Sequence, residues 1–228
     1  MTSSPQLTAP SMLSATERLN SDLAAPFRAF LRTVIADAGA HVRFLNLLSL
    51  LEHIGSRKIM LSQMKGILTQ DILKHLAEET RHAFFFKREA EKLAGRGLEG
   101  YPDADTLAAG SGKLYFGRLD SGLTRGITSN GGEAHAETGY LWVSLVIELR
   151  AIWVYRLYQE AVIEAGYPLP LKGIIAEEDK HLIDMVDRLA AIGFDTSVAL
   201  PSAMDLEKTL FTRLLTAMRA GVAQPVAA

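Results

Sequence analysis

The stretches AEETRH (residues 77–82) and AEEDKH (residues 176–181) decide the fold. Each contains a glutamate three residues before a histidine; the pairs are Glu79 with His82 and Glu178 with His181. Residues three apart lie on the same face of an α-helix, so each stretch can direct a carboxylate and an imidazole toward one point. The two stretches therefore predict two long helices that each present a pair of metal-binding groups.

Two further segments carry one glutamate each among apolar residues. Glu52 lies in LLSLLEH (residues 47–53) and Glu148 in VSLVIEL (residues 143–149), and each precedes one Glu-x-x-His stretch by a similar distance. An unpaired carboxylate moved into a dry interior costs several kcal/mol, and four converging carboxylates would also repel one another. Two divalent cations would relieve both problems. Carboxylate oxygens and neutral imidazoles together suit iron or manganese.

Apolar periodicity and turn residues predict an all-α fold, in which two long helices, a long crossover and two more long helices form a four-helix bundle. Additional helices are expected at both ends, in one domain over residues 14–220 between flexible tails at 1–13 and 221–228. The first helical region is expected to begin at a capping box of Ser14 and Glu17, to be interrupted at Pro26, to bend near Gly39 and to end near Leu61. After a turn at Gly66, the second and third long helices are expected over 67–93 and 137–165. The fourth long helix is expected from Pro168 or Pro170 to Ala191, and a last helix from a capping box of Ser202 and Asp205 to Arg219.

Residues 95–139 differ from the rest of the chain. They hold 11 of the 18 glycines and little periodicity, so we interpret them as a long crossover that acts as a lid or as the wall of a substrate channel. Gly95, Gly97 and Gly100 match GxGxxG. Because they follow a helix and not a strand, we interpret them as a helix C-cap and loop.

Helix rise predicts the heights of the four glutamates along the bundle. About 20 Å of helix separates the Gly66 turn from Glu52 on one side and from Glu79 on the other, so these two return to the same height. The second pair fits less well. Glu148 lies about 27 Å before Gly166, whereas Glu178 lies only about 12 Å after Pro170, so tilt or an earlier helix end is required.

Composition excludes several classes of protein. The 228 residues include 24 Lys and Arg against 26 Asp and Glu, and this balance favours no nucleic-acid partner, tRNA included, and no anionic membrane surface. The absence of cysteine excludes disulfides, iron–sulfur clusters, thiolate zinc sites and a cysteine nucleophile.

The first residues lack the features of a secretory signal. The apolar stretch 140–158 contains Glu148, Arg150 and Arg156, which favours a core helix over a membrane span, and we expect a cytoplasmic protein.

The ligand pattern resembles that of the ferritin-like di-iron carboxylate proteins, which carry one glutamate on each of two helices and Glu-x-x-His on each of two others. The resemblance covers roughly residues 40–190. It implies two iron ions, with manganese or a mixed centre as alternatives; the implied ligands are Glu52, Glu79 and His82 for one ion and Glu148, Glu178 and His181 for the other. The version with two histidines is more similar to the dioxygen-activating members and the rubrerythrins than to the storage ferritins.

The resemblance implies an oxidase or oxygenase that uses dioxygen or peroxide on a small, hydrophobic substrate. Without cysteine, the electrons would come from a separate donor. The alternatives are a ferroxidase or peroxide scavenger of the ferritin or rubrerythrin kind, and a metal-free helical interaction module whose charges coincide by chance. The chain length and apolar helices are also compatible with a homodimer.

Four neighbouring residues receive simpler interpretations. Glu78 and Glu177 lie about 100° round the helix from the ligand glutamates and are expected to be solvated charges. His75 lies on the ligand face, four residues before Glu79, and a core histidine with a local hydrogen bond is favoured over a partner of the metal ligands. Tyr155 lies on the face of Glu148, where core packing is favoured over proton or electron donation.

Overall fold

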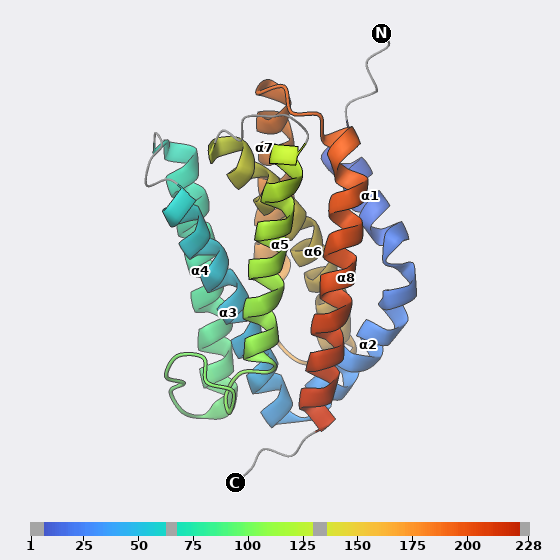
Figure 1. Cartoon of the computed structure of the whole chain (residues 1–228). Helices are drawn as coiled ribbons and strands as arrows, with labels where there is room; N and C mark the ends of the chain where they lie inside the picture. Colours follow the sequence, from blue (N-terminus) through green and yellow to red (C-terminus); the bar gives the residue numbers. More distant parts are fainter. Residues whose placement is uncertain (1–6, 63–67, 130–135, 224–228) are drawn as a thin grey trace.

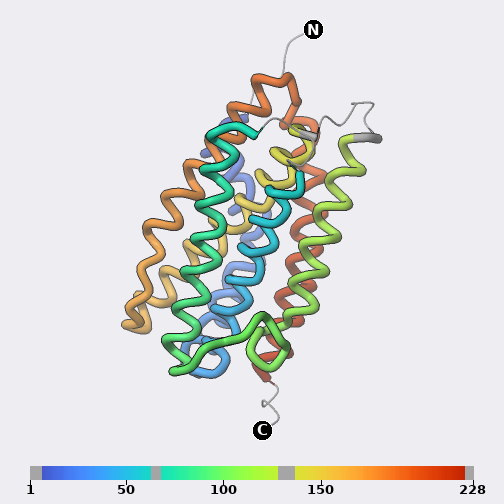
Figure 2. Tube along the Cα trace, turned by 90° about the vertical axis from the view of Figure 1, so that its left-hand side faces the viewer, coloured from blue at the N-terminus to red at the C-terminus, as the bar shows by residue number. Residues whose placement is uncertain are grey.

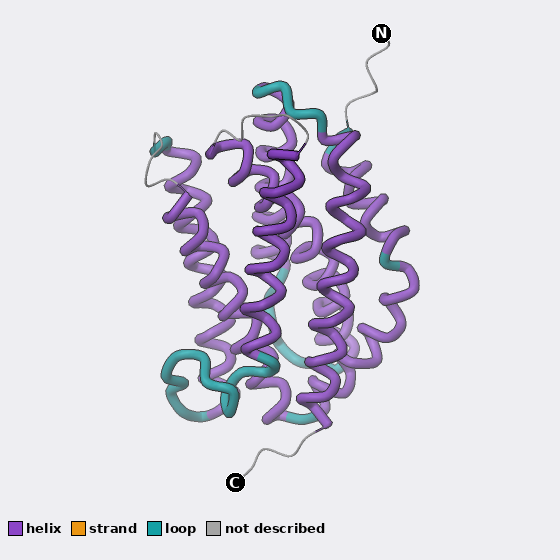
Figure 3. The backbone as a smooth tube through the Cα atoms, viewed as in Figure 1, coloured by secondary structure: helices purple, strands orange, loops and turns teal. Residues whose placement is uncertain are grey.

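The computed structural model describes residues 7–62, 68–129 and 136–223, and helices joined by loops make up all of this part of the chain (Figure 3). The all-α prediction is confirmed. The eight helices of the described residues are α1 (Ala9–Leu19), α2 (Ser21–Ala36), α3 (Ala38–Ser62), α4 (Gln70–Ala94), α5 (Ala109–Ser129), α6 (Ala136–Glu164), α7 (Lys172–Ala191) and α8 (Thr196–Ala223).

Two antiparallel pairs, α3 with α4 and α6 with α7, form the part of the molecule that carries the glutamates and histidines (Figures 1 and 2). Helices α5 and α8 pack together and cover one side of these pairs, while α1 and α2 lie along α6 at the outer edge (Figure 1). One continuous apolar core joins all eight helices. The four long helices thus bring segments from both halves of the sequence into one interior.

The N-terminal helices begin and end at other residues than expected. The capping box joins Thr8 and Ser11, not Ser14 and Glu17, because α1 already begins at Ala9. The helix is interrupted at Asn20, six residues before Pro26, which lies inside α2. Pro26 is the sixth residue of α2, so the helix continues through it without the hydrogen bond that its missing N–H would have made.

The bend expected near Gly39 is present at Asp37, where α2 and α3 meet at 119°. The Asp37 carboxylate accepts a hydrogen bond from the backbone N–H of Ala40 at 2.7 Å, which caps the first turn of α3. Among the described helices none is long and apolar enough to cross a membrane by itself. The bent pair of α2 and α3 reaches the required length and composition only when its two helices are taken together.

The long helices end close to the expected residues. Helix α4 ends at Ala94 and is capped by Gly95, whose φ of 65° is the left-handed conformation that glycine adopts without strain, as the C-cap interpretation predicts. Helix α7 begins at Lys172, just after the two prolines. The turn expected at Gly66 lies outside the described residues.

The crossover contains a helix that the sequence did not indicate. Helix α5 occupies residues 109–129, and its apolar side chains Tyr115, Phe116, Leu119, Leu123 and Ile127 are buried. Its five glycines hid this pattern, and two of them serve close packing between helices. A Cβ at Gly112 would lie 2.9 Å from Leu47 Cδ1 of α3, and one at Gly122 would lie 2.5 Å from Leu206 Cδ2 of α8.

The last helix also starts earlier than expected. Helix α8 begins at Thr196, and the Asp195 carboxylate accepts hydrogen bonds from the backbone N–H groups of Ser197 and Val198. The expected capping box of Ser202 and Asp205 is therefore wrong, because Asp195 caps the helix first. Pro201 is accommodated in the second turn.

The expected mismatch in height between Glu148 and Glu178 is resolved by the connection between α6 and α7. Helix α6 ends at Glu164 and α7 begins at Lys172, so seven residues link them. Non-helical chain covers up to about 3.3 Å per residue, compared with 1.5 Å in a helix, so this link can make up the difference. Glu148 accordingly lies level with the other glutamates.

Candidate metal centre

Four helices direct six buried acidic and histidine side chains to one place: Glu52 from α3, Glu79 and His82 from α4, Glu148 from α6, and Glu178 and His181 from α7. None of the six residues is more than 7% exposed. They are the six that the sequence singled out, and the structure brings all of them together. Sequence periodicity succeeded because each lies on the apolar stripe of its own helix.

The ligand atoms form two groups, and within each group they lie within 4.8 Å of one another. One group is Glu52, Glu79, His82 and Glu178; the other is His75, Glu79, Glu148 and His181. Glu79 belongs to both groups. The two oxygens of Glu178 also face different histidines, with Oε1 2.9 Å from His82 Nδ1 and Oε2 3.0 Å from His181 Nδ1. The grouping thus differs from the one that the resemblance implies: Glu178 joins Glu52, Glu79 and His82, and His75 joins Glu148 and His181.

Four buried polar atoms of this cluster have no hydrogen-bond partner: His75 Nε2, Glu79 Oε1, His82 Nδ1 and Glu178 Oε1. A buried polar atom without a partner costs about 1–3 kcal/mol, so four at one point need an explanation. All four are nitrogen or oxygen donors of the types that bind first-row transition metals. The residues therefore fit a site that holds metal ions.

The electrostatics of the cluster point in the same direction. Burial and the charges of Glu79 and Glu178 raise the pKa of Glu52 well above its ordinary value. Burial and the same two neighbours do so for Glu148. Burial opposes ionisation of Glu178 too, but a hydrogen bond from His181 and the nearby imidazole of His82 outweigh it and lower the pKa of that carboxyl. Extra positive charge at this point stabilises the carboxylates, and metal ions supply it without protons.

Glu78 and Glu177 are half-buried and each is hydrogen-bonded to a histidine of the cluster, which corrects the interpretation of both as solvated charges. His82 donates from Nε2 to Glu177 Oε2 at 2.7 Å, and His181 donates from Nε2 to Glu78 Oε2 at 2.9 Å. With a metal ion bound, these bonds would keep the proton on Nε2 and leave Nδ1 of each ring to the ion. The sequence signal for these contacts is the extra glutamate directly before each ligand glutamate, since a side chain one residue round the helix can point toward a neighbouring helix.

His75 is a seventh candidate ligand. Its Nε2 lies 3.3 Å from Glu79 Oε1 and 3.6 Å from Glu148 Oε1, and its Nδ1 forms a hydrogen bond with the hydroxyl of Tyr140 on α6. The expected local hydrogen bond is therefore replaced by one to another helix. The signal was its position on the ligand face of α4, one turn before Glu79.

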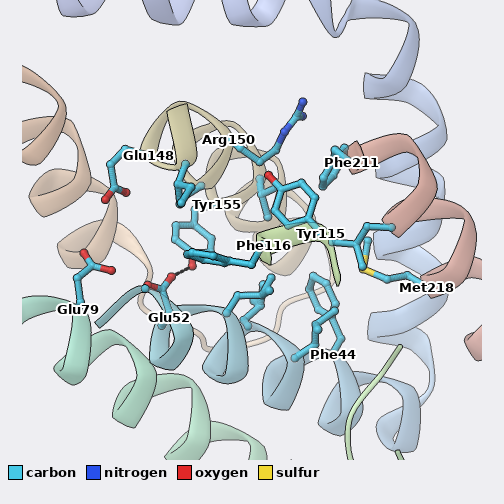
Figure 4. A pocket seen from close by; sticks show the side chains of 18 of the residues that line it. Phe44, Glu52, Glu79, Tyr115, Phe116, Glu148, Arg150, Tyr155, Phe211 and Met218 are labelled. Atoms are coloured by element: carbon cyan, nitrogen blue, oxygen red, sulfur yellow. Dashed lines mark hydrogen bonds between the residues drawn. The ribbon is translucent and has the colours of Figure 1, made fainter. Parts of the chain in front are cut away.

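Tyr155 contributes more than core packing. Its hydroxyl donates a hydrogen bond to Glu52 Oε1 (Figure 4), and its ring packs on Phe86 with the centroids 5.4 Å apart. The bond satisfies one of the two carboxylate oxygens of Glu52. Tyr155 is thus placed to hold Glu52 in one orientation.

An apolar cavity begins at the cluster and extends between α3, α5, α6 and α8. Figure 4 shows the carboxylates of Glu52, Glu79 and Glu148 at one end and Phe211 and Met218 at the other. On another side, between α4, α6 and α7, a groove with many charged side chains reaches His75 and His181. The cluster is therefore approached by one apolar and one polar route.

Comparison of the chain with protein-family models, with curated proteins and with solved structures found no match. The buried groups of glutamate and histidine are able to hold a metal ion. What the chain does is inferred from that chemistry.

Proposed function

We propose that the chain is a ferritin-like di-iron carboxylate oxidoreductase, an oxidase or oxygenase that activates dioxygen for attack on a small hydrophobic substrate. The observation that carries the proposal is the convergence of four buried glutamates and three histidines with unpartnered nitrogen and oxygen atoms at their centre. Helices α3, α4, α6 and α7 would be the four helices of the bundle. Their ligand pattern is that of the di-iron carboxylate proteins.

Iron fits the donor set, since imidazole and carboxylate suit it and thiolate is missing from the chain. When bound, iron supplies electrons to dioxygen. Insertion of one oxygen atom into a C–H bond consumes dioxygen, two electrons and two protons and releases one water. A separate protein or small molecule would deliver the electrons, because the chain has no cysteine for an iron–sulfur cluster.

The side chains of the chain itself would perform three tasks. Glu78 and Glu177 orient the histidine rings, and Tyr155 orients Glu52. Glu79, which belongs to both groups, would be shared by the two ions, and Glu52, Glu148 and Glu178 would supply further carboxylate oxygens. The aromatic and aliphatic wall of the cavity excludes water from the face where a substrate would react.

The polar groove favours a second candidate, a ferroxidase or peroxide-scavenging iron protein. His75 and His181 line this groove together with charged side chains of both signs: Asp71, Glu78, Asp184 and Asp187, and Lys74, Lys180 and Arg188. Such a groove admits water and small ions, ferrous iron and peroxide among them, to the histidine side of the cluster. A protein of this kind would oxidise ferrous iron or reduce peroxide without an organic substrate.

Metal analysis tests the proposal. Purified wild-type protein should carry about two ions per chain, as a two-ion carboxylate site requires. Glu79→Ala and His181→Ala should lose most of this metal. His53→Ala is the matched control, because the ring of His53 stacks on Tyr101 away from the cluster. Unchanged metal content in both cluster variants would refute the metal centre.

Oxygen uptake separates the two candidate functions. With reduced iron bound and an electron donor present, an oxygenase consumes dioxygen faster when an apolar substrate is added. A ferroxidase consumes dioxygen in proportion to the added ferrous iron and is indifferent to apolar compounds. Native mass adds a second criterion, since iron storage requires a large shell-like assembly.

A further inference from the structure

Gly55 lies inside α3, where its missing side chain leaves space beside the metal centre. Glycine destabilises the interior of a helix relative to alanine, so its presence there calls for a reason. Close packing is not that reason. A Cβ at this position would lie 3.6 Å from Glu79 Oε2 and 3.9 Å from Phe116 Cζ, which are ordinary contacts. What a side chain at residue 55 would occupy is the cavity, which Gly55 lines together with Glu52 and Glu79.

We propose that this cavity binds an uncharged, slender, mainly apolar molecule whose reacting end lies between Gly55 and Glu79. This inference rests on the proposed function and names the substrate class of the same site. Its basis is the shape of the cavity, the chemistry of its wall and the distribution of charge at its two ends.

The cavity is narrow. The centre of a water-sized sphere can occupy only about 70 Å³ of it. One water molecule needs about 10–15 Å³ by this measure, so the space corresponds to about five to seven methylene-sized groups. An unbranched chain of that length would fit, whereas a fused ring system would require the helices to move apart.

The wall is almost entirely apolar. It is formed by aliphatic and aromatic side chains from α3, α5, α6 and α8, among them Phe44, Leu48, Phe116, Val154, Leu214 and Met218. Such a wall offers hydrogen bonds to few groups, so a ligand must be apolar along most of its length. Any polar group of the ligand is best placed at the end of the cavity that holds the carboxylates.

Neither end of the cavity favours a charged ligand. Glu52, Glu79 and Glu148 at one end repel an anion. Arg150 lines the cavity, but its guanidinium is bound by both oxygens of Glu207 and points away from Phe116 and Tyr155 (Figure 4). A cation would have to leave water for an apolar wall and would compete with the metal ions.

Trp153 provides a signal for binding. Its ring lies 5.3 Å from that of Phe27 and 5.8 Å from that of Phe211, and both phenylalanines line the cavity. The second tryptophan, Trp142, packs on Phe194 and does not line it. In a Trp142→Phe background, Trp153 fluorescence therefore reports on cavity occupancy.

The experiment titrates this protein, as purified and with its metal content measured, with 1-hexanol, hexanoate and hexylammonium. Saturable binding of 1-hexanol, at least tenfold tighter than that of either ion, is the expected result. From 1-butanol to 1-hexanol, affinity should rise about fourfold for each added methylene and then level off once the cavity is full. Tighter binding of hexanoate or hexylammonium than of hexanol would overturn the proposed class.

Gly55→Leu locates the binding site and should weaken hexanol binding at least tenfold. Gly117→Leu on α5 is the matched control, because residue 117 is exposed with open space around it, and its affinity should stay within twofold of wild type. Gly55→Ala is included in case Gly55→Leu does not fold, since a Cβ at residue 55 fits the structure. It should weaken hexanol binding by a smaller factor than Gly55→Leu does. Unchanged affinity in both Gly55 variants would overturn the inference.

The two proposals fail in different ways. Wild-type protein that binds hexanol but takes up no metal would refute the metal centre and leave the cavity assignment standing. Protein that holds about two ions per chain and binds none of the three probes would refute the substrate class alone.

Discussion

Oε2 of Glu177 on α7 lies 2.7 Å from Nε2 of His82 on α4, so the first glutamate of one Glu-Glu-x-x-His stretch orients the histidine of the other. Glu78 on α4 orients His181 on α7 in the same way, at 2.9 Å. The two stretches are therefore interlocked: each supplies ligands to the cluster and holds in place a ligand of its partner helix. Arg81 contacts Glu177 at 2.7 Å and anchors one of the two bonds from outside.

Removal of an outer carboxylate should weaken metal binding without removing a ligand. Glu177→Ala frees the His82 ring to rotate and to change tautomer, so we expect metal affinity to fall about 10- to 100-fold. Glu78→Ala should act in the same way through His181. Competition with a chelator of known affinity measures the change.

Glu164→Ala is the control for these two variants, because Glu164 is exposed at the end of α6. Its metal affinity should equal that of the wild type. If Glu177→Ala and Glu78→Ala also match the wild type, the outer carboxylates do not orient the histidines.

The cluster residues could be predicted from the sequence because their positions depend on the period of the helix alone. Glu79 and His82 share a face whatever surrounds them, and an apolar stripe marks that face as buried. Glu78 and Glu177 could not be predicted in this way. Their angle on their own helix is fixed by the sequence, but the ring they meet belongs to a helix about a hundred residues away.

Helix α5 was missed for a different physical reason. Glycine contributes nothing to an apolar pattern, yet Gly112 and Gly122 are where α5 comes closest to α3 and α8. Low helix propensity and close helix packing thus give the same sequence signal as a loop. The early start of α8 was missed because Ser202 and Asp205 follow Pro201, and proline is a common first residue of a helix, whereas here Pro201 lies in the second turn of a helix that Asp195 has already capped.

Close packing at Gly122 leads to a second prediction. In Gly122→Ala the new Cβ would lie 2.5 Å from Leu206 Cδ2, which is too short for any contact. Because Leu206 is half-buried and flexible and can move aside, we expect the free energy of unfolding to fall by about 1 kcal/mol, the low end for overpacked sites, measured by urea denaturation. Leu206→Ala in the same chain removes the clashing atom and should restore part of the loss.

Gly117→Ala is the matched control on the same helix. A Cβ there meets no atom within 4 Å, so the gain in helix propensity should raise stability by up to about 1 kcal/mol. Equal effects at residues 117 and 122 would show that α5 does not pack closely against α8 at Gly122.

The buried ion pair of Arg150 and Glu207 leads to a third prediction. Both oxygens of Glu207 bind the guanidinium, and Glu207 also accepts a hydrogen bond from Tyr115 at 2.7 Å. Glu207→Ala leaves Arg150 as an uncompensated buried charge and should lower stability by about 3–5 kcal/mol. The double variant Arg150→Met with Glu207→Leu should be clearly more stable than Glu207→Ala, as thermal unfolding of the three proteins would show.

His41 should make the stability of the protein sensitive to mild acid. Burial lowers the pKa of its imidazole to about 4, and the ring is held neutral between Tyr158, to which it is hydrogen-bonded, and Tyr167. In the unfolded chain the pKa returns to about 6.5, so between these values the unfolded state binds more protons than the native state. Stability contributed by the neutral ring is therefore fully present above pH 6.5 and falls as the pH drops toward 4, by up to about 1.4 kcal/mol per pH unit.

Urea denaturation at pH 7.5 and 5.0 should show a loss that is up to about 2 kcal/mol greater for wild type than for His41→Gln, which can still bond to Tyr158 but does not titrate. Equal losses in the two proteins would mean that His41 is already accessible to protons in the folded state.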